Sequence, residues 1–327
     1  MTPRARAAAS LRAASRWRPA EYAFWAAALA SWLFLPGQYL LLNEIAIAGL
    51  FAVSLDLVLG YGGIVSLGHA AFFGFGAYVA GLLTMAGVAE PLTGLLIAGV
   101  ATTLLGLATS VLVLRGSDLT RIMVTLSVSL VLLEIANRMT WLTGGADGLQ
   151  GIAFTPLLGL FEFDMFGRVA YGYSLAVLFV LFALARRLVV SPFGWSVRAA
   201  SGNPLRTAAI GIPVTRRLVG VYGFAAGLAG VAGALLAQTS QFVSLDVLAF
   251  HRSAEVLLML VIGGTGYLYG GLIGALLFKV VQDRLAELTP QYWQFWIGLL
   301  LVLLVLAGRE RLFALPRAAW RAVWRRA

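Results

Sequence analysis

Long apolar stretches alternate with short polar or glycine-rich connections over almost the whole chain. A membrane-spanning helix needs about 20 mainly apolar residues, so this spacing predicts an all-α polytopic membrane protein with ten transmembrane or re-entrant helices. The stretches on either side of Gly263 are open to a second interpretation, as one broken or re-entrant element. The approximate cores lie at 21–36, 40–59, 66–87, 92–114, 119–141, 170–189, 217–238, 254–264, 267–283 and 292–308.

One long basic, turn-rich segment at 186–217 interrupts the apolar stretches and contains no acidic residue. It predicts two short helices, each with a polar N-cap and a proline at the first helical position, beginning at Ser191 and Asn203. Such helices either dock into a groove on a soluble partner or cover the ends of the protein's own spans. Apolar faces are expected at Phe193, Val197 and Ala200 of the first helix and at Leu205, Ala208 and Ala209 of the second.

The composition supports the membrane assignment, with 61% hydrophobic and 12% charged residues against about 25% charged in soluble domains. With both termini on the cytoplasmic side, 19 of the 24 Lys and Arg residues fall in cytoplasmic segments, as the positive-inside rule requires. The net charge of +10 therefore reflects topology and not a nucleic-acid surface. We expect a basic cytoplasmic tail at 1–20, a transmembrane domain at 21–308 with a cytoplasmic segment at 190–216, and a second basic tail at 309–327.

The residue inventory argues against several kinds of chemistry. The chain has no cysteine and only two histidines, so we expect no protein-built metal site and no cofactor. No phosphate-binding loop is found, so any use of ATP requires a second polypeptide. The sequence shows no cluster of Asp, His and Ser residues of the kind that forms a catalytic site, which argues against an enzyme. Glu134 and Arg138, four residues apart, are expected to neutralise each other on one helix face.

Glycines interrupt the apolar pattern in both halves of the chain, and this predicts a transport site near the middle of the membrane. The alternative is that they only allow close helix packing. His69 is interpreted first as a hydrogen-bonded packing residue and second as a functional group. The candidate translocation path consists of Ser66, Gly68, His69, Gly74, Tyr78, Gly263, Gly264, Thr265 and Tyr267, whose backbone dipoles and hydroxyls suit a small polar or zwitterionic solute.

Five stretches, in this order, resemble the LivM-type permeases of bacterial ABC importers for branched-chain amino acids. They are GYGGIVSLGHAAFFGFGAY at 60–78, TGGADGLQGI at 143–152, SPFG at 191–194, AAIG at 208–211 and EVLLMLVIGGTG at 255–266. The resemblance implies a multi-pass inner-membrane permease that works by alternating access. The implied partners are separate cytoplasmic ATPase subunits, a second permease of the LivH type, a periplasmic solute-binding protein and the lipid bilayer.

The resemblance also implies that residues 191–211 of the basic segment hold the helices that couple the permease to its ATPases. The candidate coupling residues are Ser191, Pro192, Phe193, Gly194, Arg198, Asn203, Pro204, Arg206 and Gly211. The second coupling helix of the family usually carries an acidic residue near its start, where this chain has Pro204. This difference predicts another charge pattern, with an acidic ATPase patch facing Arg198 and Arg206. The resemblance leaves open the solute, among branched-chain and other amino acids, amides, urea and aromatic acids, and the alternative function is an autonomous carrier or channel.

Overall fold

The computed structural model describes residues 17–164, 166–292, 295–299 and 302. The tail at 309–327, most of the tail at 1–20 and most of the expected core at 292–308 lie outside the described residues. The chain divides into two compact units, Met1–Ala275 and Leu276–Ala327. The first unit contains the basic segment and the candidate path, and the packing described below concerns that unit.

The helices follow the apolar stretches of the sequence. The first part of the chain forms α2 (Pro19–Phe34), α3 (Tyr39–Asp56), the π-helix η1 (Leu57–Tyr61), α4 (Ala70–Met85), α5 (Pro91–Val113), α6 (Asp118–Arg138), α7 (Thr140–Thr143) and the 3-10 helix η2 (Gly145–Asp147). The second part forms α8 (Arg168–Val190), α9 (Pro192–Gly202), α10 (Pro204–Ala209), α11 (Val214–Ser240), the 3-10 helix η3 (Leu245–Leu248), α12 (Phe250–Gly263) and α13 (Leu268–Leu288). The described residues contain isolated β-bridges but no strand, so the prediction of an all-α fold is confirmed.

The membrane-spanning character of the fold is also confirmed. Within the described residues, five helical segments are long and apolar enough to cross a membrane: Tyr39–Tyr61, Pro91–Val113, Asp118–Arg138, Arg168–Val190 and Val214–Ser240. A sixth span results if α12 and α13, bent by 111° at their junction, count as one crossing. The α4 helix is also apolar, but at 16 residues it is shorter than the roughly 20 residues of a complete span.

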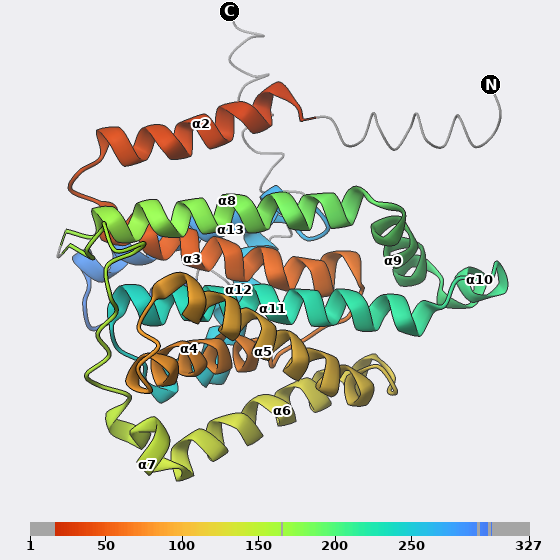
Figure 1. Cartoon of the computed structure of the whole chain (residues 1–327). Helices are drawn as coiled ribbons and strands as arrows, with labels where there is room; N and C mark the ends of the chain where they lie inside the picture. Colours follow the sequence, from red (N-terminus) through yellow and green to blue (C-terminus); the bar gives the residue numbers. More distant parts are fainter. Residues whose placement is uncertain (1–16, 165, 293–294, 300–301, 303–327) are drawn as a thin grey trace, which may run out of the picture. The chain divides into compact units, whose positions relative to one another are not determined.

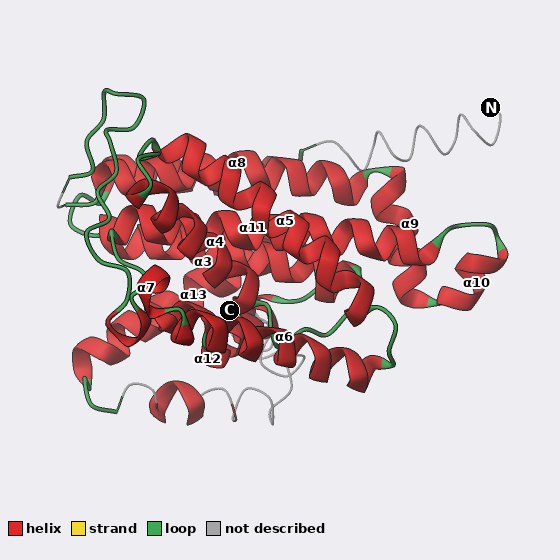
Figure 2. Cartoon of the chain, turned by 60° about the horizontal axis from the view of Figure 1, so that its bottom comes forward, coloured by secondary structure: helices red, strands yellow, loops and turns green. Residues whose placement is uncertain are grey.

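The centre of the first unit is α11, which packs against α5, α4 and α3. In the most apolar 18-residue stretch of α11, 83% is buried, whereas in that of α6 only 17% is buried. The α6 helix therefore presents most of its surface outward. Glu134 and Arg138 form the expected ion pair on this outer helix. Figure 2 shows α9 and α10 at one end of the long helices and the loop at 148–164 at the opposite end.

Glycines allow α4 and α11 to approach each other closely. A Cβ atom added to Gly233 would lie 1.8 Å from the Phe73 carbonyl oxygen, and one added to Gly76 would lie 2.1 Å from the Gly230 carbonyl oxygen. Both distances are shorter than any carbon atom tolerates, so the two helices touch through their backbones. The close-packing role of the glycines in α11, one of the two interpretations from the sequence, is therefore present at these positions.

We expect Gly233→Ala to destabilise the protein by about 1–3 kcal/mol, because the new methyl group must push α4 away from α11. The measurement is the apparent Tm of the purified protein in detergent. Gly94→Ala is the matched control, because a Cβ atom at Gly94 would meet only the Gln238 side-chain nitrogen at an ordinary 3.5 Å. Equal Tm values for the two variants would contradict this account of the contact.

Candidate functional site

The basic segment folds into the two short helices predicted from its sequence. Ser191 is the N-cap of α9 and accepts a hydrogen bond from the Gly194 backbone N–H, with Pro192 at the first helical turn. Asn203 caps α10 in the same way, accepting from the Arg206 backbone N–H at 2.9 Å. The side-chain oxygens of the two caps thus satisfy backbone donors that each helix start leaves free. Gly202 is the last residue of α9, and Gly211 follows α10 at a positive φ of 86°.

The apolar face of α9 packs on the protein's own helices. Val197 and Ala200 are buried, and Phe193 is half-buried, with the Arg217 guanidinium 5.3 Å from its ring centre. Gly194 has no space for a side chain, because a Cβ atom there would lie 2.2 Å from the Val189 carbonyl oxygen. For α9 the arrangement therefore agrees with the second interpretation, a helix that covers the ends of its own spans.

The second helix is oriented differently. The predicted apolar face of α10 is exposed, with Leu205 84% exposed, and Thr207 is the buried residue of this helix. Ile210 directly after the helix is 71% exposed. Leu205 and Ile210 form an apolar projection, which we call the α10 tip, and for α10 the first interpretation fits better, a surface offered to a soluble partner.

Arg198 is exposed on α9, and its guanidinium connects this helix to the break between α12 and α13. Its guanidinium donates a hydrogen bond to the Gly266 carbonyl oxygen at 3.2 Å and lies 4.4 Å from the ring centre of Tyr61. The Gly266 backbone N–H in turn donates to Asp56 Oδ1 at 2.7 Å. Arg198 remains exposed in this arrangement, so the expected contact between Arg198 and an acidic ATPase patch stays a prediction.

This connection ends where α3 changes into a π-helix. The wider η1 turn is closed by hydrogen bonds such as that from the Gly62 N–H to the Leu57 carbonyl at 3.0 Å. π-Helical turns often occur at functional sites. A Cβ atom on Gly60 would lie 2.2 Å from Asp56 Oδ1 and 2.3 Å from the Gly266 nitrogen. Only glycine at position 60 therefore leaves space for the hydrogen bond between Asp56 and Gly266.

The break between α12 and α13 is built on glycines with backbone angles that other residues rarely adopt. Gly264 has a φ of 103° and Gly266 a φ of 76°. Gly263 and Gly274 allow the two helices to fold against each other, because a Cβ atom on either would lie 1.8 Å from a backbone oxygen of the other helix. These glycines together allow a sharp bend between the two helices. Thr265 and Tyr267 lie at this bend and are exposed.

The basic segment and the break share a cavity of about 410 Å³. Trp195 and Arg198 of α9 line it, together with Tyr61 of η1 and Tyr267 next to the break. Arg186 at the end of α8 contributes a further wall and forms an ion pair with Glu21 at 3.0 Å. A movement of α9 would therefore change the walls of a hollow that also contacts η1 and the break.

The remaining path candidates lie just before and within α4. Ser66, His69 and Tyr78 are all buried there, and His69 Nε2 lies 2.9 Å from the Ser54 hydroxyl. The His69 ring stacks on Phe51, so the prediction of a hydrogen-bonded packing residue is consistent with its surroundings. Ser66 Oγ, His69 Nδ1 and Tyr78 Oη each have no hydrogen-bond partner among the described residues. Buried polar atoms of this kind are uncommon and are frequently functional.

The glycines of the candidate path pack against other backbones or side chains. A Cβ atom on Gly68 would lie 1.8 Å from the Thr125 carbonyl oxygen of α6, and one on Gly74 would lie 2.4 Å from Leu248 Cδ2. The nine path candidates thus form two groups, one before and within α4 and one at the break after α12. In the described part of the chain, no group of three or more His, Cys, Asp or Glu side chains could hold a metal ion.

The sequence interpretation missed the connection through Asp56, Gly60 and Gly266. A carboxylate inside an apolar stretch is a functional hypothesis by default, and Asp56 was a signal of this kind. Its side chain is fully buried, and Oδ2 has no partner among the described residues. The partner of Oδ1 is a backbone N–H more than 200 positions away, which residue types and spacing do not reveal.

The comparison with known protein families places the chain among transport proteins. The family described as "Branched-chain amino acid transport system / permease component" matches residues 39–305, a range that includes η1, the basic segment and the break. The chain belongs to this family. The resemblance to LivM-type permeases is thereby confirmed, and the chain is a permease subunit of an ABC importer.

Individual relatives of the permease share about a quarter of its residues. The high-affinity branched-chain amino acid transport system permease proteins LivM of Salmonella typhimurium and Escherichia coli are each 28% identical, over 82% of this chain and 68% of theirs. The ribose import permease protein RbsC of Bacillus subtilis is 27% identical, over 83% of this chain and 84% of its own. No solved structure matches the permease.

Proposed function

We propose that this permease moves branched-chain amino acids or related small polar solutes across the bacterial inner membrane, driven by separate cytoplasmic ATPase subunits. The observation that carries the mechanism is the hydrogen-bonded connection from Arg198 on α9 through Gly266 to Asp56. The solute class is supported by the two LivM relatives, whereas the ribose permease RbsC is the reason to include other small polar solutes.

In this proposal the two short helices have different tasks. The α10 tip at Leu205 and Ile210 docks into an apolar groove of the ATPase, and exposed Arg206 contacts an acidic patch beside that groove. The α9 helix, anchored on the ends of the spans, transmits the movement inward through Arg198. The basic segment is then cytoplasmic, and both termini lie on the same side of the membrane.

The solute passes along the two groups of path residues by alternating access. Before and within α4 the path is lined by Ser66, His69 and Tyr78, whose unpartnered polar atoms are suited to transient contacts with a zwitterionic solute. At the break, Gly264 and Thr265 present backbone dipoles and a hydroxyl group. ATP-driven movement of α9 pulls on Gly266 and so opens or closes the break. A periplasmic binding protein delivers the solute, and a second permease of the LivH type completes the membrane part.

We expect Tyr78→Phe to lower solute uptake several-fold without changing the apparent Tm, because it removes only the buried hydroxyl that has no partner among the described residues. A purely structural Tyr78 would tolerate the change, since removing an unpaired buried hydroxyl is neutral or stabilising. The measurement is uptake by proteoliposomes that contain the assembled importer. Unchanged uptake by Tyr78→Phe would exclude the hydroxyl from the path.

An autonomous carrier or channel is the competing function, and one experiment distinguishes the two. The chain and its co-purifying subunits are reconstituted in vesicles, and uptake of labelled leucine is measured with ATP, with a non-hydrolysable analogue, and with an ion gradient alone. The proposal requires a co-purifying ATPase and uptake only with ATP. Uptake driven by the gradient without any ATPase would refute it.

A further inference from the structure

An apolar groove of about 730 Å³ runs between α2 and α8. Its floor is formed where α8 carries the small residues Gly172 and Ala176, one helical turn apart. The Trp32 indole of α2 lies against Gly172, and a Cβ atom there would be 3.1 Å from its ring nitrogen. No residue of α2 is buried, so this helix does not close the gap over α8.

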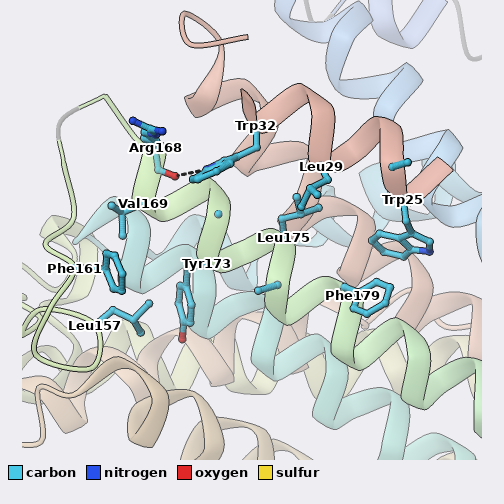
Figure 3. A pocket seen from close by; sticks show the side chains of 13 residues that line it. Trp25, Leu29, Trp32, Leu157, Phe161, Arg168, Val169, Tyr173, Leu175 and Phe179 are labelled. Atoms are coloured by element: carbon cyan, nitrogen blue, oxygen red, sulfur yellow. Dashed lines mark hydrogen bonds between the residues drawn. The ribbon is translucent and has the colours of Figure 1, made fainter. Parts of the chain in front are cut away.

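The groove has the length of one membrane leaflet. Figure 3 shows Arg168 and Trp32 at one end and Trp25 and Phe179 at the other. Along α8, positions 168 and 179 are separated by about 16 Å, at roughly 1.5 Å per helical residue. This is about half of the roughly 30 Å hydrocarbon core of a bilayer. An extended acyl chain that enters at the Arg168 end would therefore reach Phe179 near the middle of the membrane.

The mouth of the groove carries one exposed cation. The Arg168 guanidinium lies 5.0 Å from the Trp32 ring centre and, among the described residues, forms no salt bridge with a carboxylate. Asp164, the nearby acid, accepts instead from the backbone N–H groups of Arg168 and Val169. Stacking on a ring leaves the edge of a guanidinium free, and this edge matches the geometry of a phosphate group.

We propose that the groove is a binding site for one phospholipid, with an acyl chain between α2 and α8 and the lipid phosphate on Arg168. The charge at the mouth, the apolar walls and the one-leaflet length together favour this occupant over a free anion or a polar solute. The lipid completes the packing of α2, which the protein's own side chains leave open.

The test uses the complete importer in detergent, with phosphatidylglycerol as the added lipid, and native mass spectrometry to count retained lipids. The wild-type protein should keep one tightly bound phospholipid. Ala176→Trp fills the floor of the groove and should remove this lipid, whereas Val180→Trp, an equally bulky change at an exposed position one turn further along α8, should not. Arg168→Gln should weaken binding about ten-fold, as expected for a charge-assisted contact, and Arg138→Gln, at an exposed arginine of α6, should leave it unchanged.

A photoreactive residue at position 176 provides a second measurement, which does not require the lipid to stay bound in detergent. In membranes it should cross-link to phospholipid. Cross-linking to another copy of the chain or to a partner subunit, or equal lipid loss in all four variants, would overturn the proposal. Phosphate-free lipids that bind as tightly as phosphatidylglycerol would overturn the role of Arg168.

Discussion

Gly60→Ala is expected to reduce ATP-dependent uptake at least about ten-fold while the importer still assembles. The added methyl group would lie 2.2 Å from Asp56 Oδ1 and 2.3 Å from the Gly266 nitrogen, so the hydrogen bond between these atoms cannot form. A hydrogen bond to a charged group contributes about 1.5–3 kcal/mol, and each 1.4 kcal/mol corresponds to a factor of ten. The measurement is uptake by proteoliposomes at equal amounts of assembled complex.

The control for this prediction is Gly202→Ala at the end of α9. A Cβ atom at Gly202 meets nothing within 4 Å, so the variant adds the same methyl group to the coupling segment without touching the connection. It should transport like the wild-type protein. If Gly60→Ala also transports normally, the contact between Asp56 and Gly266 has no part in the cycle.

Leu205→Asp should release the ATPase from the permease, with at least about ten-fold weaker association. Leu205 is the most exposed part of the α10 tip, and we propose that it enters an apolar groove of the ATPase. A carboxylate there would lose its hydration without gaining a partner, and central apolar anchors of interfaces typically contribute 2 kcal/mol or more. The measurement is co-purification of the ATPase with tagged permease, followed by titration of the ATPase into the separated permease.

Leu160→Asp is the matched control, because Leu160 is also strongly exposed, at 78%, but lies in the loop at the opposite end of the helices. This variant should retain the ATPase. A Leu205→Asp permease that keeps its ATPase at wild-type affinity would show that the α10 tip is not the docking surface.

Much of the fold followed from patterns that act over short distances. Helix positions followed from apolar stretches, and the start of α9 and α10 followed from a polar cap and a proline at Ser191 and Asn203. These features depend on residues a few positions apart, so the sequence alone expresses them. The close contact of Gly233 with α4 could likewise be expected from the small residues of α11.

The proposed connection from Arg198 through Gly266 to Asp56 could not be predicted, because it joins distant segments through backbone groups. Arg198 was expected to face an acidic patch of an ATPase, and its contact with the Gly266 carbonyl was not expected. Backbone N–H and C=O groups are the same at every non-proline position, so no residue type marks Gly266 as the junction. The sequence also could not predict that the apolar face of α10 is exposed. Periodicity identifies an apolar face but does not identify what covers it.

The most direct test of the central claim is a double-mutant cycle on uptake with Arg198→Ala, Gly60→Ala and the combined variant, with Arg187→Ala as the control for loss of an exposed arginine charge. If α9 acts on the break through Gly266 and Asp56, each single change interrupts the same connection. The account predicts that uptake by the combined variant equals, within about two-fold, uptake by whichever single variant transports less. The reason is that the effects of mutations at coupled residues are not additive. Losses that multiply in the combined variant would mean that Arg198 and Gly60 act independently, and this would contradict the proposed connection.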